Sequence, residues 1–339
     1  MAGENGNGAI MRGEIAESVS VAARLIADRG RFEAIGTELA RRDPAVVVVA
    51  GRGTSDHAAI YARYLLEHAL GVPVALAAAS LLTQYGIESA SPQSALLAFS
   101  QSGAGPDMIA LVESAKRRGA YSIALTNDPA SGLAAAADAT ADLDAGPERA
   151  VAATKTYLAE LISVALIATA AARAVGRDGS WAEEFNSLPN RMQAALDSAR
   201  MWLADAADTP VVRALHGGNR ALVVGRGFEY PNALELALKL RETTAMFADG
   251  YSAADLLHGP IASASADVAS IALSTDPATE KSIDGSLDRL RAARAPLLLI
   301  RSDASGSRRM GRDEELVLPT GPHGPLCTPV TAIAGLAII

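Results

Sequence analysis

Apolar residues recur along this chain in short continuous runs that alternate with stretches of helical spacing. The first run, at 46–50, reads VVVVA, and apolar positions three and four apart precede it between residues 11 and 42. A continuous apolar run of this length is typical of a strand buried on both faces of a parallel sheet. Strands that alternate with helices predict an α/β protein with a parallel sheet flanked by helices.

The same pattern occurs twice. Gly51-Arg52-Gly53 follows the first strand, and Gly225-Arg226-Gly227 follows an apolar strand at 221–224. Further strands are predicted at 74–78, 95–99, 121–125 and 140–143 after the first copy, and at 246–248, 269–273, 296–300 and 315–318 after the second. A duplicated five-stranded unit accounts for the length better than two unrelated domains. We expect each copy to be a doubly wound, flavodoxin-like domain.

The same patterns divide the chain into segments. Residues 1–10 are rich in Gly and Asn and are expected to form a flexible tail. Residues 11–42 are predicted to be an N-terminal helical segment. The first domain is predicted at 43–205, including a linker helix, and the second at 206–339, because Asp208-Thr209-Pro210 interrupts the helical pattern.

Composition excludes several classes of protein. Half of the residues are apolar and the net charge is −8, which argues against a disordered chain and against a general nucleic-acid binder. No apolar run reaches the ~18 residues of a spanning helix, and no signal peptide is apparent. The single cysteine, Cys327, excludes a disulfide scaffold and a cysteine-rich zinc site. We expect a cytoplasmic protein with no metal, no redox cofactor, and neither nucleic acid nor membrane as partner.

Polar loops follow two of the predicted strands. Neither Gly-x-Gly turn has the third glycine of a dinucleotide site, and we interpret the second turn as structural. In the first copy, Thr54 and Ser55 place hydroxyls at a helix N-terminus, where anions bind. Ser100-Gln101-Ser102-Gly103 follows the strand at 95–99 and precedes a helix opened by Pro106. The alternative is an ordinary capped loop, but the neighbouring Thr54 and Ser55 favour an anion site.

A charged group is predicted on one helix of the second copy. Glu235, Lys239 and Glu242 share a single helical face. A solvated ion-pair face is the alternative, but apolar flanks favour a partly buried site with a carboxylate acting as base. His258, before Gly259-Pro260, is a further candidate, which Asp255 could orient.

Five motifs in this order resemble the tandem SIS (sugar isomerase) domain family, in particular the isomerase half of glucosamine-6-phosphate synthase and its stand-alone relatives. The matching segments are Gly53-Thr54-Ser55, Ser100-Gln101-Ser102-Gly103, Ala153-Thr154-Lys155, the run from Gly225 to Glu242, and His258-Gly259-Pro260. Met11-x-x-Glu14-Ile15-x-Glu17 is similar to the opening segment of the family. The resemblance covers nearly the whole chain.

The resemblance implies a sugar 6-phosphate substrate and a role for each matching residue. The phosphate would be bound by Gly53, Thr54, Ser55, Ser100, Gln101 and Ser102. Glu242 corresponds to the carboxylate that moves the proton between C1 and C2. Lys239 corresponds to a lysine near the sugar and is expected to be catalytic, and Glu235 is expected to bind the substrate. His258 corresponds to a histidine that assists ring opening from the partner subunit, which implies a homodimer. Val151 and Ala153 correspond to sugar contacts, although the family commonly has serine at the position of Ala153.

Three departures from the family change what is expected. No glutaminase domain is recognised, because Cys327 lies far from the N-terminus, so we expect no release of ammonia from glutamine. Gly105 stands where the family usually has threonine, which removes one hydroxyl from the phosphate site. Relatives end in a tail whose lysine closes over the sugar. Here no lysine follows Lys281 and the sequence ends in the apolar run 331–339, so we expect the C-terminal tail to be missing.

Three functions remain open. Removal of the C2 proton followed by reprotonation at C1 is isomerisation, and later loss of the C2 amine is deamination. An amino-sugar 6-phosphate isomerase/deaminase, of the glucosamine-6-phosphate type, is the first hypothesis. The alternative is a dehydratase, a lyase that eliminates the C3 hydroxyl of an N-acetylhexosamine 6-phosphate such as N-acetylglucosamine 6-phosphate. A non-catalytic sugar-phosphate sensor is the second alternative, for which Glu242 and His258 would be superfluous.

Overall fold

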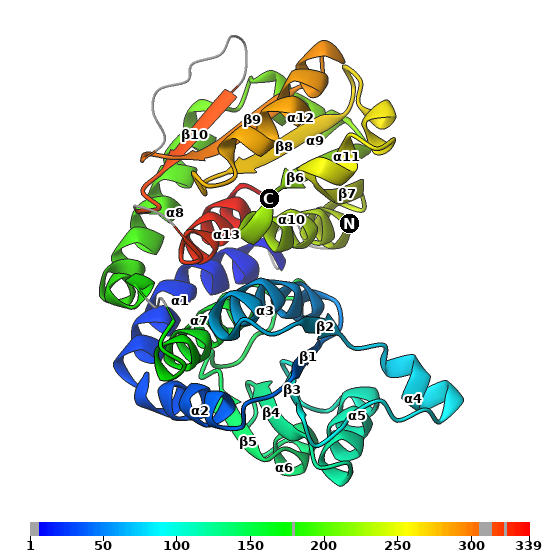
Figure 1. Ribbon diagram of the computed structural model, residues 1–339. Coiled ribbons are helices and arrows are strands. Elements are labelled where there is room, and N and C mark those ends of the chain that lie inside the picture. The colour runs from blue at the N-terminus through cyan, green and yellow to red at the C-terminus, as the bar shows by residue number, and fades with distance from the viewer. Residues whose placement is uncertain (1–6, 178–179, 305–313, 322–323) are drawn as a thin grey trace. The chain divides into compact units, whose positions relative to one another are not determined.

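The computed structural model describes residues 7–177, 180–304, 314–321 and 324–339 (Figure 1). They contain two five-stranded sheets in which every pairing is parallel. The first has the order β2-β1-β3-β4-β5, with β1 (Val46–Ala50), β2 (Val74–Leu76), β3 (Ser94–Phe99), β4 (Tyr121–Thr126) and β5 (Ala139–Asp142). The second has the order β7-β6-β8-β9-β10, with β6 (Arg220–Gly225), β7 (Phe247–Ser252), β8 (Ala269–Ser274), β9 (Leu297–Ser302) and β10 (Glu314–Leu318).

The two sheets therefore repeat one topology, and the duplicated unit with flavodoxin-like strand order is confirmed. The largest difference from the predicted strands is in β7, which continues to Ser252 instead of ending at residue 248. It continues because it pairs with β6 over its full length, from Arg220↔Phe247 to Gly225↔Ser252. A sequence pattern of short apolar runs does not show how far such pairing extends.

Helices cover both faces of the first sheet. One face is covered by α2 (Gly30–Arg41), α3 (Thr54–Leu70) and α7 (Lys155–Ala174), and α2 and α3 both pack against α7. On the other face, apolar residues of β3 and β4 form a core with α5 (Pro106–Arg117) and α6 (Gly132–Ala136). Two further elements, α4 (Ala79–Tyr85) and a 3-10 helix (Ser180–Ser187), complete this part of the chain.

Helix α7 is the central helix of this arrangement. It is long and apolar enough to cross a membrane by length and composition alone, but 89% of its most apolar stretch is buried inside the protein. Gly36 on α2 permits the close packing, since a Cβ there would lie 2.1 Å from the carbonyl oxygen of Ile167. The apolar character of α7 is thus explained by its place in the core.

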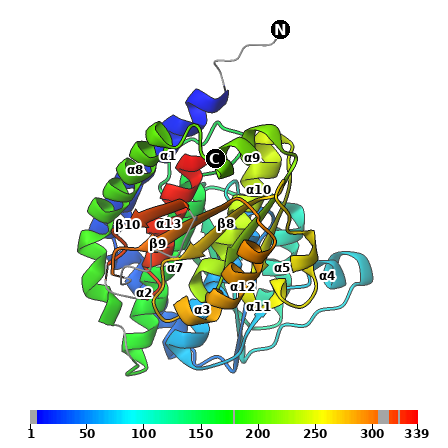
Figure 2. The same ribbon diagram turned by 90° about the horizontal axis from the view of Figure 1, so that it is seen from above.

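The second sheet is covered in the same way. Helices α8 (Leu188–Asp205), α10 (Tyr230–Thr244) and α13 (Cys327–Ile338) pack together, and α8 and α13 lie side by side in both views (Figures 1 and 2). On the opposite face, α11 (Ala253–Leu256) and α12 (Glu280–Ala292) form an apolar core with β6, β8 and β9. Helix α9 (Pro210–Gly217) contacts β8 and β9.

Packing groups the chain into two compact units. The first unit comprises Ser20–Glu148 and Lys155–Asn186, and the second comprises Met1–Val19, Arg149–Thr154 and Ser187–Ile339. Packing thus places α8 in the second unit, whereas the repeat pattern places it as a linker helix of the first domain. The boundary of the repeats after residue 205 stays a prediction.

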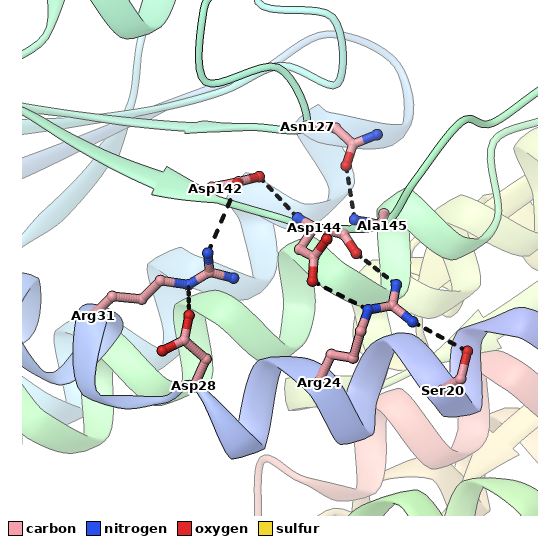
Figure 3. Close-up of polar contacts among 8 residues, drawn as sticks. All are labelled: Ser20, Arg24, Asp28, Arg31, Asn127, Asp142, Asp144 and Ala145. Atoms are coloured by element: carbon pink, nitrogen blue, oxygen red, sulfur yellow. Dashed lines mark hydrogen bonds and ion pairs between the residues drawn. The ribbon is translucent and has the colours of Figure 1, made fainter.

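Helix α1 (Asn7–Ala27) begins the described chain. Residues 7–10, which were expected to belong to a flexible tail, are its first residues, and the rest of that tail lies outside the described residues. The last turns of α1 anchor the chain where it leaves β5 (Figure 3). Arg24 binds Asp144 through Nε to Oδ2 at 3.1 Å and through Nη2 to the main-chain oxygen at 2.7 Å. Asn127 Oδ1 accepts a hydrogen bond from Ala145 N at 2.8 Å, so both sides of this turn are fixed.

Candidate active site

The six residues predicted to bind phosphate lie at one edge of the first sheet. Strands β1 and β3 are parallel neighbours in register from Val46↔Ser94 to Ala50↔Ala98, so their carboxyl ends meet. This is also the point at which the strand order reverses, the usual place for a ligand in an open α/β sheet. Gly53, Thr54 and Ser55 follow β1, and Ser100, Gln101 and Ser102 follow β3.

The turn after β1 is tight because two glycines allow it. A Cβ at Gly51 would lie 2.3 Å from the carbonyl oxygen of Ser55, and Gly53 has φ +54°. Helix α3 therefore begins at Thr54 and directs its positive end towards this edge. The buried Ser55 hydroxyl donates to Glu160 Oε1 on α7 at 2.7 Å. Its proton is thus engaged within the protein, and its backbone N–H donates to the main-chain oxygen of Arg52 at 3.1 Å, so Ser55 fixes the conformation of the turn beside Thr54.

The loop after β3 is held in one conformation by its own hydrogen bonds. Ser100 Oγ accepts from Gly103 N at 3.2 Å, and Ser102 Oγ accepts from Ala104 N at 3.3 Å. The main-chain oxygen of Gln101 accepts from Asn127 N at 3.0 Å at the end of β4. Gly103 has φ +58°, and a Cβ there would lie 2.1 Å from Ser131 Oγ. The serine hydroxyls are therefore positioned in advance, which reduces the entropy cost of binding.

The charged face of α10 lies in the second unit and is largely buried. Lys239 Nζ lies 3.3 Å from Glu235 Oε1 and 2.6 Å from Glu242 Oε2. The side chains of Lys239 and Glu235 are each 1% exposed, whereas that of Glu242 is 31% exposed. The solvated ion-pair face is therefore excluded, and Glu242 is the member of the group that a ligand can reach.

Glu242 also lines a cavity of about 480 Å³ within the second unit. Val151 lies on its wall, while Ala153, two residues further along, does not contribute to it. Among the described residues that line the cavity, only Glu242 and Arg12 carry charged side chains, and Met11, Ile15 and Leu203 contribute apolar surface. A carboxylate that faces a cavity and is held by a buried lysine is a suitable general base.

A buried glutamate that the sequence analysis did not assign holds the segment carrying Val151. Glu14, which is 4% exposed, accepts hydrogen bonds from Arg149 N at 2.6 Å and from Ala150 N at 3.1 Å. Charged acceptors of backbone N–H groups form strong hydrogen bonds. The only signal for this contact in the sequence is the segment Met11-x-x-Glu14, which gives no information about its partner 135 residues away.

His258 is exposed in the turn that follows α11. Its backbone N donates to the Asp255 main-chain oxygen at 3.0 Å, so the contact with Asp255 is through the backbone. The residues that line the cavity beside Glu242 do not include His258. Among the residues that the structure describes, no group of three or more His, Cys, Asp or Glu side chains is arranged to hold a metal ion.

A second unassigned acid, Glu229, is completely buried in the short 3-10 helix (Gly227–Glu229) that follows β6. Asn232 Nδ2 donates to Glu229 Oε2 at 2.8 Å, and the hydroxyls of Thr275 and Thr331 face the carboxyl group. Burial, together with the negative charge of Asp276, raises the pKa of Glu229 to about 7, although the hydrogen bonds to the carboxyl group act in the opposite direction. Glu229 corresponds in the second repeat to Ser55 in the first, because the two repeats are offset by 174 residues. Without an alignment of the two repeats, the sequence does not show this correspondence.

We expect Glu229→Gln to stabilise the protein at pH 8 and to have little effect at pH 5. The pKa of Glu229 rises from 4.5 to about 7 on folding, so the folded state binds the extra proton between these values. Stability is therefore lost as the pH rises through this window, by roughly 3 kcal/mol in total. Glutamine keeps an acceptor for Asn232 without the charge. Urea unfolding of both proteins at pH 5 and pH 8 measures the difference, and equal stability of the two at pH 8 would contradict the expectation.

Comparison with known proteins agrees with this architecture. The SIS domain family matches residues 42–170 and 214–334. The isomerizing glutamine–fructose-6-phosphate aminotransferase of Halobacterium salinarum is 31% identical over 99% of this chain and 56% of its own length. The chain spans about half the length of the curated relatives it matches.

Two solved structures have the same fold. The C-terminal domain of glucosamine–fructose-6-phosphate aminotransferase from Francisella tularensis has a TM-score of 0.86 at 23% identity, covering 99% of this chain and 96% of that chain. Tagatose-6-phosphate ketose/aldose isomerase from Escherichia coli has a TM-score of 0.73 at 20% identity, covering 97% and 91%. The chain therefore belongs to the SIS domain family and contains two SIS domains in tandem.

Proposed function

We propose that this chain is an amino-sugar 6-phosphate isomerase/deaminase that removes the C2 proton of an open-chain hexosamine 6-phosphate. The observation that carries the proposal is the ion-paired group on α10, in which the buried Lys239 holds Glu242 at the wall of a cavity. Proton abstraction next to a carbonyl needs a base within about 3 Å of the carbon acid and a charge that stabilises the enediolate. Glu242 supplies the base, and Lys239 supplies the positive charge beside it.

The remaining residues are assigned to binding and ring opening. Gly53, Thr54, Ser100, Gln101 and Ser102 bind the phosphate, whose binding energy orients the reacting carbons. Ser55 holds the turn in place through its hydrogen bond to Glu160. Val151 and Ala153 contact the sugar, and the buried Glu235 supports the site through its ion pair with Lys239. His258 assists ring opening, and its exposed position is suited to a role in a second copy of the chain, so we propose a homodimer. We also propose a cytoplasmic location, since the apolar helix α7 is explained by burial.

The cavity beside Glu242 favours one alternative. Met11, Ile15, Val151 and Leu203 give it an apolar wall, which is better suited to an N-acetyl group than to a free ammonium group. An N-acetylated substrate cannot lose its amine as ammonia. The same base would then eliminate the C3 hydroxyl as water, which makes the chain a dehydratase of an N-acetylhexosamine 6-phosphate.

Product analysis distinguishes these reactions. The protein is incubated with glucosamine 6-phosphate and, separately, with N-acetylglucosamine 6-phosphate, and proton NMR is recorded together with an ammonium assay. A ketose phosphate indicates isomerisation, and ammonium indicates deamination. A new vinyl proton from the N-acetylated substrate would instead establish the dehydratase. Binding of both sugars without any product would contradict enzymatic turnover of this class and favour a sugar-phosphate sensor.

A further inference from the structure

Arg52 lies between the two glycines of the first turn, at the edge of the sheet where the phosphate is proposed to bind. We propose that Arg52 binds the substrate phosphate, and that Asp107 holds its guanidinium group in place until the phosphate arrives. This inference rests on the proposed function, because it assigns a further residue to the same anion site. Arg52 would add a positive charge to a site that otherwise consists of uncharged polar groups.

The contacts of Arg52 join the loop after β1 to the start of α5. Its Nη2 lies 2.7 Å from Asp107 Oδ2, in the first turn of α5 after the Ser100–Ser102 loop. Its Nη1 donates to the main-chain oxygen of Gly51 at 3.3 Å, at the end of β1. The guanidinium group therefore bridges the loop after β1 and the helix after β3. Its side chain is 57% exposed, so a ligand can reach it.

The charges at this edge require a cation if a phosphate is to bind. Both helices that begin here have an aspartate in the first turn, Asp56 on α3 and Asp107 on α5. The positive charge of Arg52 acts on Asp56, where it partly opposes the rise in pKa that burial causes. A phosphate dianion placed beside these two carboxylates would be repelled without a neighbouring positive charge. The planar guanidinium group can bind two phosphate oxygens at once.

The second repeat supplies an internal comparison. Arg226 occupies the same position between two glycines, but its Nη1 donates to Ser252 Oγ at 3.0 Å, at the end of β7. The residue three positions further along is Glu229, whose buried carboxylate fills the second copy of the turn. The exposed Arg52 and the half-buried Arg226 thus share a motif but differ in surroundings, which makes Arg226 a matched control.

A purely structural ion pair is the competing explanation, and replacing Asp107 separates the two. If Asp107 only positions the guanidinium group of Arg52 before the phosphate binds, Asp107→Asn removes a carboxylate that competes with the phosphate for Arg52 and repels it. Phosphate binding is then unchanged or tighter. If the pair instead shapes the loops for binding, Asp107→Asn weakens binding as much as Arg52→Ala does. Asparagine retains an acceptor for the Met108 N–H that Asp107 Oδ1 now binds at 2.9 Å, so the start of α5 is preserved.

The test is a calorimetric titration of the wild type and the variants with glucosamine 6-phosphate and with inorganic phosphate at fixed ionic strength. We expect Arg52→Ala to raise the dissociation constant about 10- to 100-fold for both ligands, the loss typical of a charged hydrogen-bonding group. Arg52→Lys, which keeps the charge without the planar fork, should give an intermediate loss. Arg226→Ala should stay within about threefold of the wild type, and thermal melting of each variant shows that it is folded.

Two results would overturn the assignment while leaving the proposed function intact. The first is a wild type that binds glucosamine 6-phosphate and an Arg52→Ala variant that binds it equally well. The second is an Asp107→Asn variant that loses as much affinity as Arg52→Ala. A wild type that binds neither glucosamine 6-phosphate nor inorganic phosphate would overturn the proposed function itself, and the assignment of Arg52 with it.

Discussion

Replacing Glu242 by glutamine should lower the rate of C2 proton removal about 10²- to 10⁴-fold, the range typical for loss of a general base. Binding of the phosphosugar should change little, because glutamine has nearly the same shape and the phosphate is bound by other residues. Lys239 retains Glu235 at 3.3 Å in this variant, so α10 remains folded. Steady-state kinetics with the active phosphosugar and a direct binding titration measure the two effects separately.

The control for this variant is Glu113→Gln, which removes one carboxylate from the exposed surface of α5. Its rate should equal that of the wild type. If Glu242→Gln kept the wild-type rate, Glu242 could not be the base. If it lost rate and binding in equal proportion, the carboxylate would act in substrate binding instead of in proton transfer.

Lys239→Met should destabilise the protein by about 3–5 kcal/mol, the cost typical of removing one partner of a buried ion pair. The substitution removes the cation 3.3 Å from Glu235, whose side chain is 1% exposed. Burying a carboxylate without a nearby opposite charge is costly, and methionine fills the space without replacing the charge. Urea unfolding of the variant and the wild type at pH 7 measures the difference.

A double variant distinguishes this explanation from a simple packing defect. In Lys239→Met with Glu235→Gln, the buried carboxylate has been neutralised as well, so much of the lost stability should return. If the double variant were less stable than Lys239→Met alone, the cost would come from packing and not from the buried charge. Glu242 remains partly exposed to solvent in both variants and adds little to the difference.

The fold could be predicted from the sequence because its signals are local. A run such as 46–50 is apolar throughout only because both faces of its strand are covered, and the repeated glycine turn shows that the unit occurs twice. The sequence also predicted that the loops after β1 and β3 lie together at one edge of the first sheet, because neighbouring parallel strands end at the same edge. The face formed by Glu235, Lys239 and Glu242 was equally predictable from helical spacing.

What the sequence could not show depends on contacts between distant segments. The burial of Lys239 depends on packing around α10, including that of α13, and a spacing rule does not distinguish a buried face from a solvated one. The burial of the Glu14 carboxylate is explained by its hydrogen bond from a backbone N–H group 135 residues away. Glu229 resembles any acidic residue near a helix start until the fold encloses it between Thr275 and Thr331. The ion pair of Arg52 with Asp107 likewise joins the loop after β1 to the first turn of α5, 55 residues further along the chain.

The central claim is that this chain removes the C2 proton of a sugar phosphate, and hydrogen exchange in D₂O tests it most directly. Wild-type protein is incubated with glucosamine 6-phosphate or N-acetylglucosamine 6-phosphate, and C2 is followed by proton NMR. We expect at least one of these sugars to incorporate deuterium at C2 or to form a product that requires loss of the C2 proton. Glucosamine without its phosphate should do neither. Binding of both phosphosugars with the C2 proton fully retained and no product formed would contradict the account.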